Sequence, residues 1–322
     1  MTYARIAGIG SCLPEKVLTN EDLEGMMDTS DEWIRERSGI ERRHVAVDGE
    51  STGSLSLIAA QRAMEMAGVT ADDLDLIVVG TCTPDKVIPA TACIVQRELG
   101  AKGCAALDLN AACSGFLYGL DYANRYFRTG GATTALVIGA ETLSRITNWD
   151  DRTTAVLFGD GAGAVVLEAN DEPGVLATHI HANGEFEDLL HTTGGISLGF
   201  DASCDRDGYV RMEGNAVFKR AVATFDSIAR ETVADLDGQF DDIDWFIPHQ
   251  ANLRIIKAAA KKLRMPMERV ICTVDRHANT SAASIPLALD LAIRDGRIRR
   301  GDQILMAAFG AGFTWGSAMI KF

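Results

Sequence analysis

The sequence predicts a layered α/β fold made of two related halves, and two observations predict it. Short apolar and β-branched runs alternate with longer segments of helical periodicity along the 322 residues. Strands that alternate with helices are typical of a largely parallel sheet covered by helices. Three segments of the first half also recur in the same order in the second half, and such recurrence indicates an internal duplication.

The strands are the short β-rich runs, and the helices are segments with apolar residues three or four positions apart. We expect strands at residues 5–9, 76–80, 105–109, 135–138 and 164–167, and again at 175–181, 245–247, 270–273, 303–307 and 315–320. We expect helices at residues 55–67, 116–128, 216–234, 253–263 and 283–294.

Three pairs of segments match between the halves. They are "DDLDLIVVG" and "DDIDWFIPH", "LDLNAACS" and "VDRHANTS", and "GAGAVVLE" and "GAGFTWGSAMI". The acidic, turn-forming segment "ANDEPG" (169–174) lies between the copies, so we expect one unit over residues 1–172 and a second over residues 173–322. The alternative is chance similarity, since α/β units commonly place an acidic turn before an apolar strand.

Composition excludes several classes of function. A hydrophobic fraction of 47% with 24% charged residues is ordinary for a soluble globular protein. No apolar run reaches the length of a membrane span, and Met1 is not followed by a basic and then apolar signal sequence. We therefore expect a cytoplasmic protein without a membrane partner. The formal net charge of −14 argues against nucleic acid as a partner.

The cysteines and histidines do not form a metal-binding pattern. The seven cysteines are scattered and none belongs to a CxxC pair, which argues against a zinc ribbon and a disulfide framework. His179 and His181 share one face of an expected strand with His191 nearby, but no cysteine or acidic residue stands at a finger-like spacing from them. We therefore expect no metal site.

Cys113 stands between the strand at 105–109 and the helix at 116–128. Taken alone, a free cysteine is more often a small buried hydrophobic residue than a nucleophile. In the aligned halves, however, Asn279 occupies nearly the same position as Cys113, and His249 follows the strand at 245–247. Because ligand sites in α/β sheets lie beyond the carboxyl ends of strands, we expect Cys113, His249 and Asn279 to converge on one site. The helix start would favour a Cys113 thiolate and lower its pKa below the ordinary value of about 8.5.

Four segments carry a resemblance to a known family: "AACSGF", "PHQANLRI", "NTSAAS" and "FGAGFTWG", in this order. With them the chain resembles the thiolase superfamily and, within it, closely resembles the β-ketoacyl-[acyl carrier protein] synthase III family over essentially its whole length. The resemblance implies a thiolase-like five-layered αβαβα fold made of two duplicated halves, a homodimer and no cofactor. It implies a decarboxylative Claisen condensation of an acyl-CoA primer with malonyl-[acyl carrier protein], which starts type II fatty-acid synthesis.

The resemblance also implies roles for the residues of the site. Cys113 would carry the acyl group, and the N–H groups of Cys113 and Ala311 would stabilise the oxyanion, with Ala311 in place of an expected glycine. His249 and Asn279 would donate hydrogen bonds to the enolate oxygen that forms on decarboxylation. Phe309 would disfavour the malonyl carboxylate by desolvation.

Further residues are implied to hold the substrates. Trp33 and Arg152 would flank the CoA adenine, Thr29 and Arg37 would lie near the nucleotide, and Gly214, Ala251 and Asn252 would line the path of the pantetheine arm. Lys219 (with its neighbour Arg220), Arg254, Lys257 and Lys261 would dock the acidic carrier protein, although an ordinary solvated helix face is the alternative. Ile88 takes a place where some relatives carry an aromatic residue, so we expect an acyl pocket that admits groups longer or more branched than acetyl.

Other readings remain open at this point. One alternative is a sibling condensing enzyme of secondary metabolism, which uses a longer acyl-CoA to make an alkylquinolone or a long-chain ketone. A cysteine hydrolase also uses Cys, His and Asn in this order, and a non-catalytic partner subunit would be expected to have lost Cys113. No glutamate matching the general base of hydroxymethylglutaryl-CoA synthase is apparent from the motifs. The run "GDGAGA" (159–164) fits a dinucleotide fingerprint, but a strand-like segment follows it where that fingerprint requires a helix.

Overall fold

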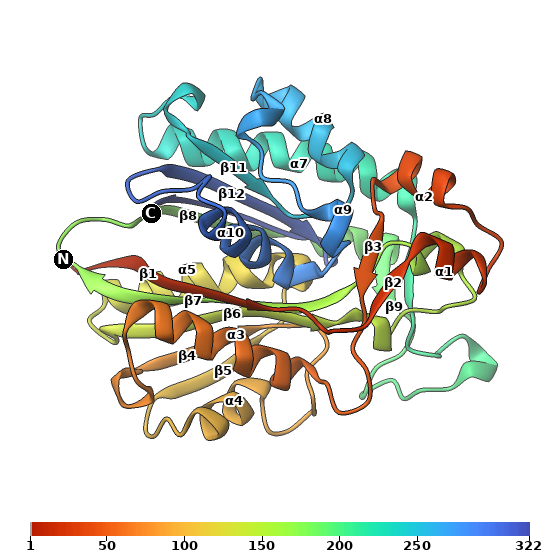
Figure 1. Ribbon diagram of the computed structural model, residues 1–322, viewed down its shortest axis with the longest axis horizontal. Coiled ribbons are helices and arrows are strands. Elements are labelled where there is room, and N and C mark those ends of the chain that lie inside the picture. The colour runs from red at the N-terminus through yellow and green to blue at the C-terminus, as the bar shows by residue number, and fades with distance from the viewer. Residues whose placement is uncertain (1) are drawn as a thin grey trace.

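The computed structural model describes residues 2–322, which form two main β-sheets with helices between and outside them (Figure 1). Helices α3 and α4 cover the outer face of the first sheet, α5 and α10 lie between the sheets, and α7 with α8 covers the outer face of the second sheet. Their bounds are α3 Thr52–Ala67, α4 Thr91–Leu99, α5 Gly115–Arg128, α7 Gly214–Asp235, α8 Leu253–Leu263 and α10 Ser284–Arg294. The expected five-layered αβαβα fold is confirmed.

The first sheet has the strand order β1-β7-β6-β4-β5. Its strands are β1 Tyr3–Cys12, β4 Leu76–Gly80, β5 Ala105–Leu109, β6 Thr134–Thr142 and β7 Asp160–Asn170. Strands β4, β5 and β6 run parallel, whereas β7 is antiparallel to both of its neighbours, β1 and β6. Strands β4 and β6 are buried at every position, as expected for central strands covered on both faces.

The second sheet has the order β11-β12-β13-β8, with β8 Val175–Ala182, β11 Trp245–Pro248, β12 Gln303–Gly310 and β13 Thr314–Lys321. Strands β11 and β12 are parallel, and β13 is antiparallel to β12 and β8. Read from β8 to β11, the second sheet has two antiparallel pairs followed by a parallel pair. The first sheet has the same succession when it is read from β1 to β4. The repetition is what a duplicated chain produces, although the boundary at residue 172 stays a prediction.

Two expectations about the sheets were wrong. The strand expected at 270–273 is absent from the described residues, and only an isolated parallel bridge joins Val270 to Phe246 at the place that β5 fills in the first sheet. The sheets are also mixed rather than largely parallel. Strand β13 follows β12 through a tight turn, and β7 is the next strand after β6 and pairs with it. Consecutive strands that pair directly in this way are antiparallel, whereas strands joined by a helical crossover are parallel.

Close packing of α3 on β1 depends on two glycines of the first strand. A Cβ atom at Gly8 would lie 2.2 Å from the Ala63 carbonyl oxygen, and one at Gly10 would lie 2.4 Å from the Ala59 carbonyl oxygen. Only glycine permits this approach of helix and strand. The run "GDGAGA" enters strand β7, so the expected strand after it is confirmed.

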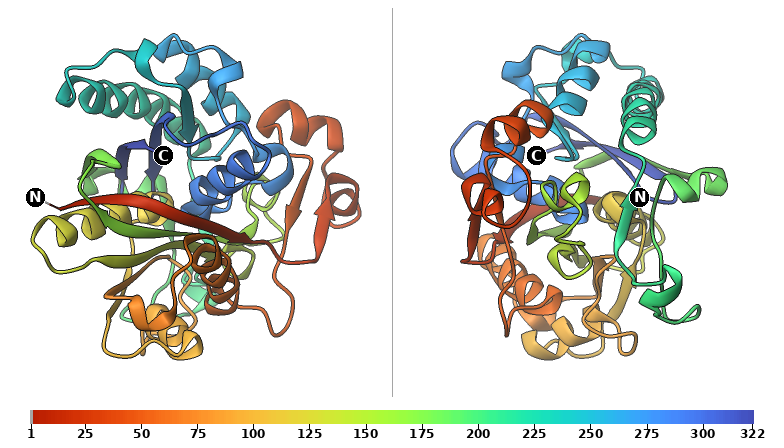
Figure 2. Two further views of the ribbon diagram at one scale, coloured as in Figure 1. Left: turned by 60° about the vertical axis from the view of Figure 1, so that its left-hand side comes forward. Right: turned by 90° about the vertical axis from the view of Figure 1, so that its right-hand side faces the viewer.

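The remaining elements gather at one end of the sheets. They include α1 (Asn20–Glu24), α2 (Asp31–Ser38), β2 (Val17–Thr19), β3 (Arg42–His44), α6 (Arg152–Ala155), α9 (Val274–His277), β9 (Leu190–Thr192) and β10 (Val210–Met212). Helix α2 contacts α8, and β3 contacts α9, so this N-terminal excursion lies against the second half of the chain (Figure 2). It thereby reaches the site described below. Among the helices of residues 2–322, none has the length and apolarity needed to cross a membrane.

Candidate active site

Cys113, His249, Asn279 and Phe309 line one cavity of about 300 Å³. Cys113 lies in the short 3₁₀ helix η2 (Ala112–Ser114) that links β5 to α5, and His249 directly follows β11. Asn279 follows α9, and Phe309 lies near the end of β12. The structure thus brings together, at the carboxyl ends of strands from both sheets, the side chains that the sequence had placed at one site.

A strained turn presents Cys113 to the cavity. Ala112 has a φ of 45°, a conformation that residues with a Cβ rarely adopt. The Asn110 side chain accepts a hydrogen bond from the Ala112 N–H (3.3 Å), and the Thr314 hydroxyl donates to the Ala111 carbonyl (2.7 Å). These bonds fix the turn on both sides of the backbone. Opposite it, a Cβ at Gly310 would lie 2.7 Å from the Cys113 nitrogen, so this position accepts only glycine.

The electrostatic environment of Cys113 differs from the one expected. Burial raises the pKa of its thiol to about 12; the Ser281 hydroxyl opposes this rise, and the nearby Glu141 carboxylate adds to it. The expectation of a lowered pKa was therefore wrong. The expectation relied on the positive end of α5. Cys113 lies in η2, two residues before α5 begins, and the loss of solvation outweighs the donors at the helix start.

His249 is buried and neutral. Burial lowers the pKa of its imidazole to about 3. Its Nδ1 lies 2.7 Å from the Ser284 Oγ, which also accepts a hydrogen bond from the Gln250 N–H (3.3 Å). The hydroxyl proton of Ser284 is then free to donate to Nδ1, and the tautomer that results carries its proton on Nε2. In that tautomer the imidazole offers the cavity a hydrogen-bond donor.

Asn279 is held so that its amide nitrogen is available. Its side-chain oxygen accepts a hydrogen bond from the Ser281 N–H (3.0 Å). Its backbone is fixed by bonds to Leu157 and Gly159 (2.9 and 3.0 Å). Because the oxygen is engaged, Nδ2 is the part of the carboxamide left for a ligand in the cavity.

The buried histidines make a testable contribution to the pH dependence of stability. Burial also lowers the pKa of His277, to about 4. An unfolded chain binds a proton at each site below about pH 6.5, whereas the folded protein resists protonation, so stability falls as the pH falls through this window. Each histidine contributes up to about 1.4 kcal/mol per pH unit.

Urea unfolding at pH 7, 6 and 5 measures this effect. We expect His249→Gln to lose less stability between pH 6 and pH 5 than the unchanged protein, by about 1 kcal/mol, whatever its stability at pH 7. Parallel pH dependences of the two proteins would contradict a neutral buried imidazole at position 249.

A second cavity, of about 510 Å³, lies on another side of Cys113. Cys113, Phe158 and Leu190 line both cavities, so the sulfur lies at their junction. Ala311 lines the second cavity beside Cys113, where its carbonyl accepts a hydrogen bond from the Thr314 hydroxyl (3.1 Å). Alanine is therefore accommodated at the position where a glycine was expected.

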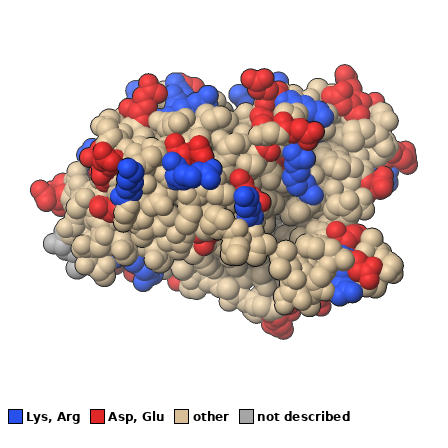
Figure 3. Space-filling model, turned by 90° about the horizontal axis from the view of Figure 1, so that it is seen from below, with Lys and Arg blue, Asp and Glu red and all other residues tan. Residues whose placement is uncertain are grey.

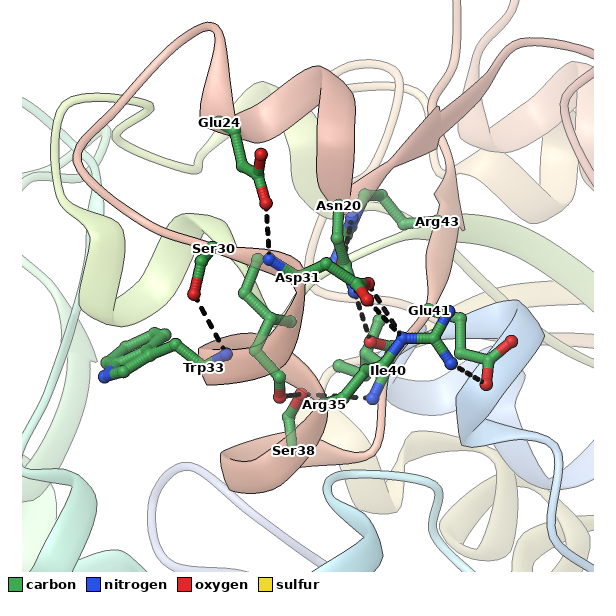
Figure 4. Close-up of polar contacts among 11 residues, drawn as sticks. Asn20, Glu24, Ser30, Asp31, Trp33, Arg35, Ser38, Ile40, Glu41 and Arg43 are labelled. Atoms are coloured by element: carbon green, nitrogen blue, oxygen red, sulfur yellow. Dashed lines mark hydrogen bonds and ion pairs between the residues drawn. The ribbon is translucent and has the colours of Figure 1, made fainter.

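Helix α2 carries Trp33 and Arg37 to the lining of the first cavity. Figure 4 shows how its start is fixed: the Ser30 hydroxyl accepts a hydrogen bond from the Trp33 N–H (3.2 Å), and Asp31 accepts from Asn20 (2.7 Å) and Arg35 (2.7 and 2.8 Å). The Trp33 ring points away from this polar network. A rigid helix thus presents an aromatic face near the mouth of the cavity.

Two of the other residues expected to contact CoA, Arg37 and Arg152, lie over the ring of Trp33. The guanidinium carbons of Arg37 and Arg152 lie 4.8 and 5.1 Å from the centre of its ring. Arg152 also donates a hydrogen bond to the Asp28 carbonyl (2.6 Å). Neither Arg152 nor Thr29 lines the cavity. Gly214, Ala251 and Asn252 do line it. Asn252 has a structural role as well, because its side chain caps α8 through the Arg254 N–H (2.8 Å).

The expected docking residues are exposed on the neighbouring helices α7 and α8. Lys219 lies on α7, and Arg254, Lys257 and Lys261 lie on α8. Arg254 also lines the first cavity and lies over the Phe218 ring, 5.7 Å from its centre. This basic stripe therefore starts at the cavity.

Ile88 lies away from both cavities of its own chain. It belongs to the segment between β4 and α4, is 82% exposed, and lines neither the first nor the second cavity. Its role in an acyl pocket stays a prediction.

Sequence reasoning did not name three residues next to the candidate site: Ser284, whose hydroxyl lies 2.7 Å from His249 Nδ1, and the hydrogen-bonded pair Ser281 and Glu141 near Cys113. A buried glutamate thus lies near Cys113, although no motif indicated one. The sequence feature that could have indicated Glu141 is an acidic residue near the end of the apolar strand "TALVIGAET". The carboxyl ends of strands are where ligand sites of α/β proteins lie.

Within residues 2–322, no three His, Cys, Asp or Glu side chains lie close enough together to hold a metal ion. The histidines of β8 have other partners: His181 Nε2 lies 3.0 Å from Glu231, and His179 lies 3.7 Å from Asp235.

Comparisons with known proteins identify the family of the chain. The family model "3-Oxoacyl-[acyl-carrier-protein (ACP)] synthase III" matches residues 107–184, and the model of the C terminal of the same synthase matches residues 234–322. The first match contains Cys113, and the second contains His249 and Asn279.

Individual relatives match over the full length. The chain is 61% identical over 322 residues to the β-ketoacyl-[acyl-carrier-protein] synthase III of Thioalkalivibrio sulfidiphilus, covering 100% of both chains. The crystal structure of the 3-oxoacyl-[acyl-carrier-protein] synthase III from Aquifex aeolicus superimposes with a TM-score of 0.94 at 46% identity, covering 99% of this chain and 100% of that one. The priming β-ketosynthase of the R1128 polyketide pathway gives 0.96 at 34% identity, covering 99% and 96%. The chain belongs to the β-ketoacyl-[acyl-carrier-protein] synthase III family.

Proposed function

We propose that the protein condenses an acyl-CoA primer with malonyl-[acyl carrier protein], releases carbon dioxide and forms a β-ketoacyl-[acyl carrier protein], the first condensation of type II fatty-acid synthesis. One observation carries the proposal: a cysteine, a neutral imidazole and a free carboxamide donor line a single cavity in a member of this family. The reaction needs a nucleophile and two hydrogen-bond donors, and these residues supply them.

The first half-reaction acylates Cys113. Its sulfur attacks the thioester carbonyl, a carbon–sulfur bond to Cys113 forms, the bond to the CoA sulfur breaks, and CoA leaves with the thiol proton. The oxyanion of the intermediate would accept hydrogen bonds from the N–H groups of Cys113 and Ala311. Both residues line the second cavity, next to the space that the acyl chain would fill.

The second half-reaction generates the carbon nucleophile. Malonyl thioester loses carbon dioxide, and negative charge moves to its thioester oxygen as the enolate forms. The Nε2–H of His249 and the Nδ2–H of Asn279 would stabilise that oxygen. The enolate carbon would then form a bond to the acyl carbonyl carbon, the bond from that carbon to the Cys113 sulfur would break, and the sulfur would take up a proton. Phe309, which is buried and packs on Phe313 with ring centres 4.5 Å apart, would leave the malonyl carboxylate poorly solvated and favour its loss.

The first cavity would hold the phosphopantetheine arm that both substrates share. Gly214, Ala251 and Asn252 lie along it, and Trp33 with Arg37 lies toward its mouth. An indole stacks on a purine, and guanidinium groups bind phosphates, so Trp33, Arg37, Arg152 and Thr29 would hold the CoA nucleotide. Because Arg152 already lies over the indole, a bound purine would require it to move.

The exposed stripe of Lys219, Arg254, Lys257 and Lys261 would dock the acidic carrier protein. We expect Arg254→Ala to raise the KM for malonyl-[acyl carrier protein] about tenfold, while the rate of acyl transfer from acyl-CoA changes less than about twofold. Charge pairing at a surface is screened by salt, so the difference should shrink above about 0.5 M salt. Lys262→Ala on the same helix is the matched control and should change neither rate. Equal losses of both half-reactions in Arg254→Ala would refute the docking role.

A homodimer is part of the proposal. Strand β5 forms an edge of the first sheet. In the segment between β4 and α4, the apolar side chains of Val87 (64%) and Ile88 (82%) are exposed. Uncharged residues cover most of the face seen from below in Figure 3, the side toward β5 and α4. An open strand edge and exposed apolar groups favour association with a second copy. A cytoplasmic location fits seven free cysteines, and the proposed chemistry uses only thioester substrates and no added cofactor.

Mass spectrometry of the products tests the proposal. Acyl-CoA and malonyl-[acyl carrier protein] should give one β-ketoacyl-[acyl carrier protein] per carbon dioxide released. A cysteine hydrolase would instead release free acid continuously from acyl-CoA alone. The sibling of secondary metabolism is less favoured, since the relative at 61% identity is a synthase III, whereas the polyketide priming synthase is 34% identical.

A further inference from the structure

Glu141 is a buried acid to which the proposed reaction assigns no role. It lies near the end of β6 and has no exposed surface. None of the ion pairs among residues 2–322 includes it. Burying a carboxylate without a cation is costly unless its oxygens accept hydrogen bonds. The groups that bond to Glu141 therefore indicate what it holds in place.

Donors from two distant segments surround this carboxylate. From the segment after β4, the Thr81 hydroxyl (3.1 Å), the Thr83 N–H (3.1 Å) and the Thr83 hydroxyl (2.6 Å) donate to Oε2. The Cys82 N–H lies 3.2 Å from Oε1 and 3.1 Å from Oε2. From the segment after α9, the Ser281 hydroxyl donates to Oε1 (3.1 Å). The carboxylate thus joins the segment after β4 to the start of the short 3₁₀ helix η8 (Ser281–Ala283).

Helix η8 packs directly on β6. A Cβ atom at Gly139 would lie 2.2 Å from the Ala282 carbonyl oxygen, so only glycine permits this contact. Ala278 and Ser281 have φ values of 57° and 48°, in a region that residues with a Cβ rarely adopt. Such a strained backbone persists only where the surrounding structure holds it. The hydrogen bond from Ser281 to Glu141, which is buried at both ends, is one of the contacts that hold it.

Ser281 connects the carboxylate to Asn279. Its hydroxyl donates to Glu141 (3.1 Å), and its backbone N–H donates to the side-chain oxygen of Asn279 (3.0 Å). The backbone of Asn279 is held separately, by hydrogen bonds to Leu157 and Gly159 (2.9 and 3.0 Å). The direction of the carboxamide therefore depends on the place of Ser281, because the contact with Ser281 fixes Oδ1 and thereby the direction of Nδ2.

We propose that Ser281 and Glu141 are positioning residues for decarboxylation. Glu141 fixes the hydroxyl of Ser281, and Ser281 orients the carboxamide so that Nδ2 of Asn279 is directed at the enolate oxygen. The proposal rests on the proposed function of Asn279 as a donor to that oxygen. No bond of Ser281 or Glu141 is made or broken in the reaction. Their effect is one of geometry, since a displacement of about 1 Å at a reacting group can cost about 100-fold in rate.

Ser281→Ala tests the proposal, because it removes the hydroxyl and keeps the backbone N–H. Carbon dioxide release from malonyl-[acyl carrier protein] is measured in the Cys113→Ala background, where no acylation occurs. We expect kcat for this release to fall about 30-fold, because the carboxamide is no longer held in place. The KM for malonyl-[acyl carrier protein] should change less than about twofold. With Cys113 present, acyl transfer from acyl-CoA should fall less than about threefold, since Asn279 acts only in the second half-reaction.

Asn279→Ala separates positioning from a general loss of structure. If Ser281 acts through the carboxamide, Ser281→Ala has nothing further to remove once Asn279 is replaced. The double variant should then release carbon dioxide within about twofold of the rate of Asn279→Ala alone. A structural role would instead give the same 30-fold loss in both backgrounds, and that result would contradict the proposal.

Glu141→Gln tests the carboxylate itself. The Thr83 N–H can only donate, so the amide oxygen should take the place of Oε2 and the amide nitrogen that of Oε1, where the Ser281 hydroxyl loses its acceptor. We expect carbon dioxide release to fall about tenfold, and to change less than about twofold when Ser281→Ala is already present. Thr81→Val is the matched control, since it removes another hydroxyl from the carboxylate but none from η8. Its rate should stay within about threefold of the unchanged value.

Three results would overturn the positioning role: a rate in Ser281→Ala within threefold of the unchanged value, an equal loss in Thr81→Val, or a folded Glu141→Gln with an unchanged rate. If Glu141→Gln does not fold, the comparison of Ser281→Ala with Asn279→Ala still decides. Failure of the unchanged protein to release any carbon dioxide would instead contradict the proposed function. A crystal structure of Ser281→Ala then tests the positioning role without activity. The Asn279 side chain should have lost its hydrogen bond to the N–H of position 281, and an unchanged bond would refute the role.

Discussion

Cys113→Ala is expected to lower the rate of acyl transfer from acyl-CoA by about 10⁴-fold or more, because the acyl group then has no sulfur to which it can transfer. The same variant should still release carbon dioxide from malonyl-[acyl carrier protein]. His249 and Asn279 are held by Ser284 and by the Ser281 N–H, and neither contact depends on the thiol. Acyl transfer is measured as the release of CoA, and decarboxylation is measured as the release of carbon dioxide.

Cys93→Ala is the control for this result. Cys93 is also a free, half-buried thiol, but it lies in α4 and lines neither cavity beside Cys113. Its removal should leave both half-reactions within about twofold of the unchanged protein. Acyl transfer that survives in Cys113→Ala and disappears in Cys93→Ala would place the nucleophile elsewhere.

Asn279→Asp is expected to have the opposite pattern. The carboxylate keeps an oxygen to accept the Ser281 N–H, but it replaces the Nδ2 donor with a second oxygen that repels the enolate. Losing one donor at a developing oxyanion costs about 3–4 kcal/mol, so carbon dioxide release should fall by about 10³-fold. Acyl transfer to Cys113 should fall much less, since the carboxamide acts only in the second half-reaction.

Asn279→Ala separates the two parts of this effect. It removes the donor without adding a charge, so its decarboxylation rate should lie between those of Asn279→Asp and the unchanged protein. A decarboxylation rate in Asn279→Asp within tenfold of the unchanged value would contradict the role of the amide.

Much of the architecture was predictable because its signals are local. Strands β4 and β5 and helix α8 have the bounds expected from their runs of apolar residues. Helix α2 was not expected, because "DEWIRERS" buries only Ile34 and Ser38 and therefore has little apolar periodicity. Helix α2 is fixed instead by polar contacts such as the hydrogen bond from Asn20 to Asp31, which joins residues 11 positions apart and leaves no mark in the apolar pattern (Figure 4).

The site was predictable only in part for a similar reason. Cys113, His249 and Asn279 follow segments that match between the halves, so the duplication indicated that they meet. The pairing of Glu141 with Ser281 joins residues 140 positions apart, and no local pattern announces it. The raised pKa of Cys113 is likewise a property of the packed interior, which outweighs the helix start that the sequence displays.

The most direct test of the central claim, that Cys113, His249 and Asn279 serve one reaction at one cavity, is a stepwise acylation experiment followed by intact-protein mass spectrometry and peptide mapping. Acyl-CoA alone should add one acyl group per chain, on Cys113, and the adduct should persist until malonyl-[acyl carrier protein] is added and then transfer to the carrier protein. An adduct on any other residue, or an adduct that hydrolyses to free acid without the second substrate, would contradict the account.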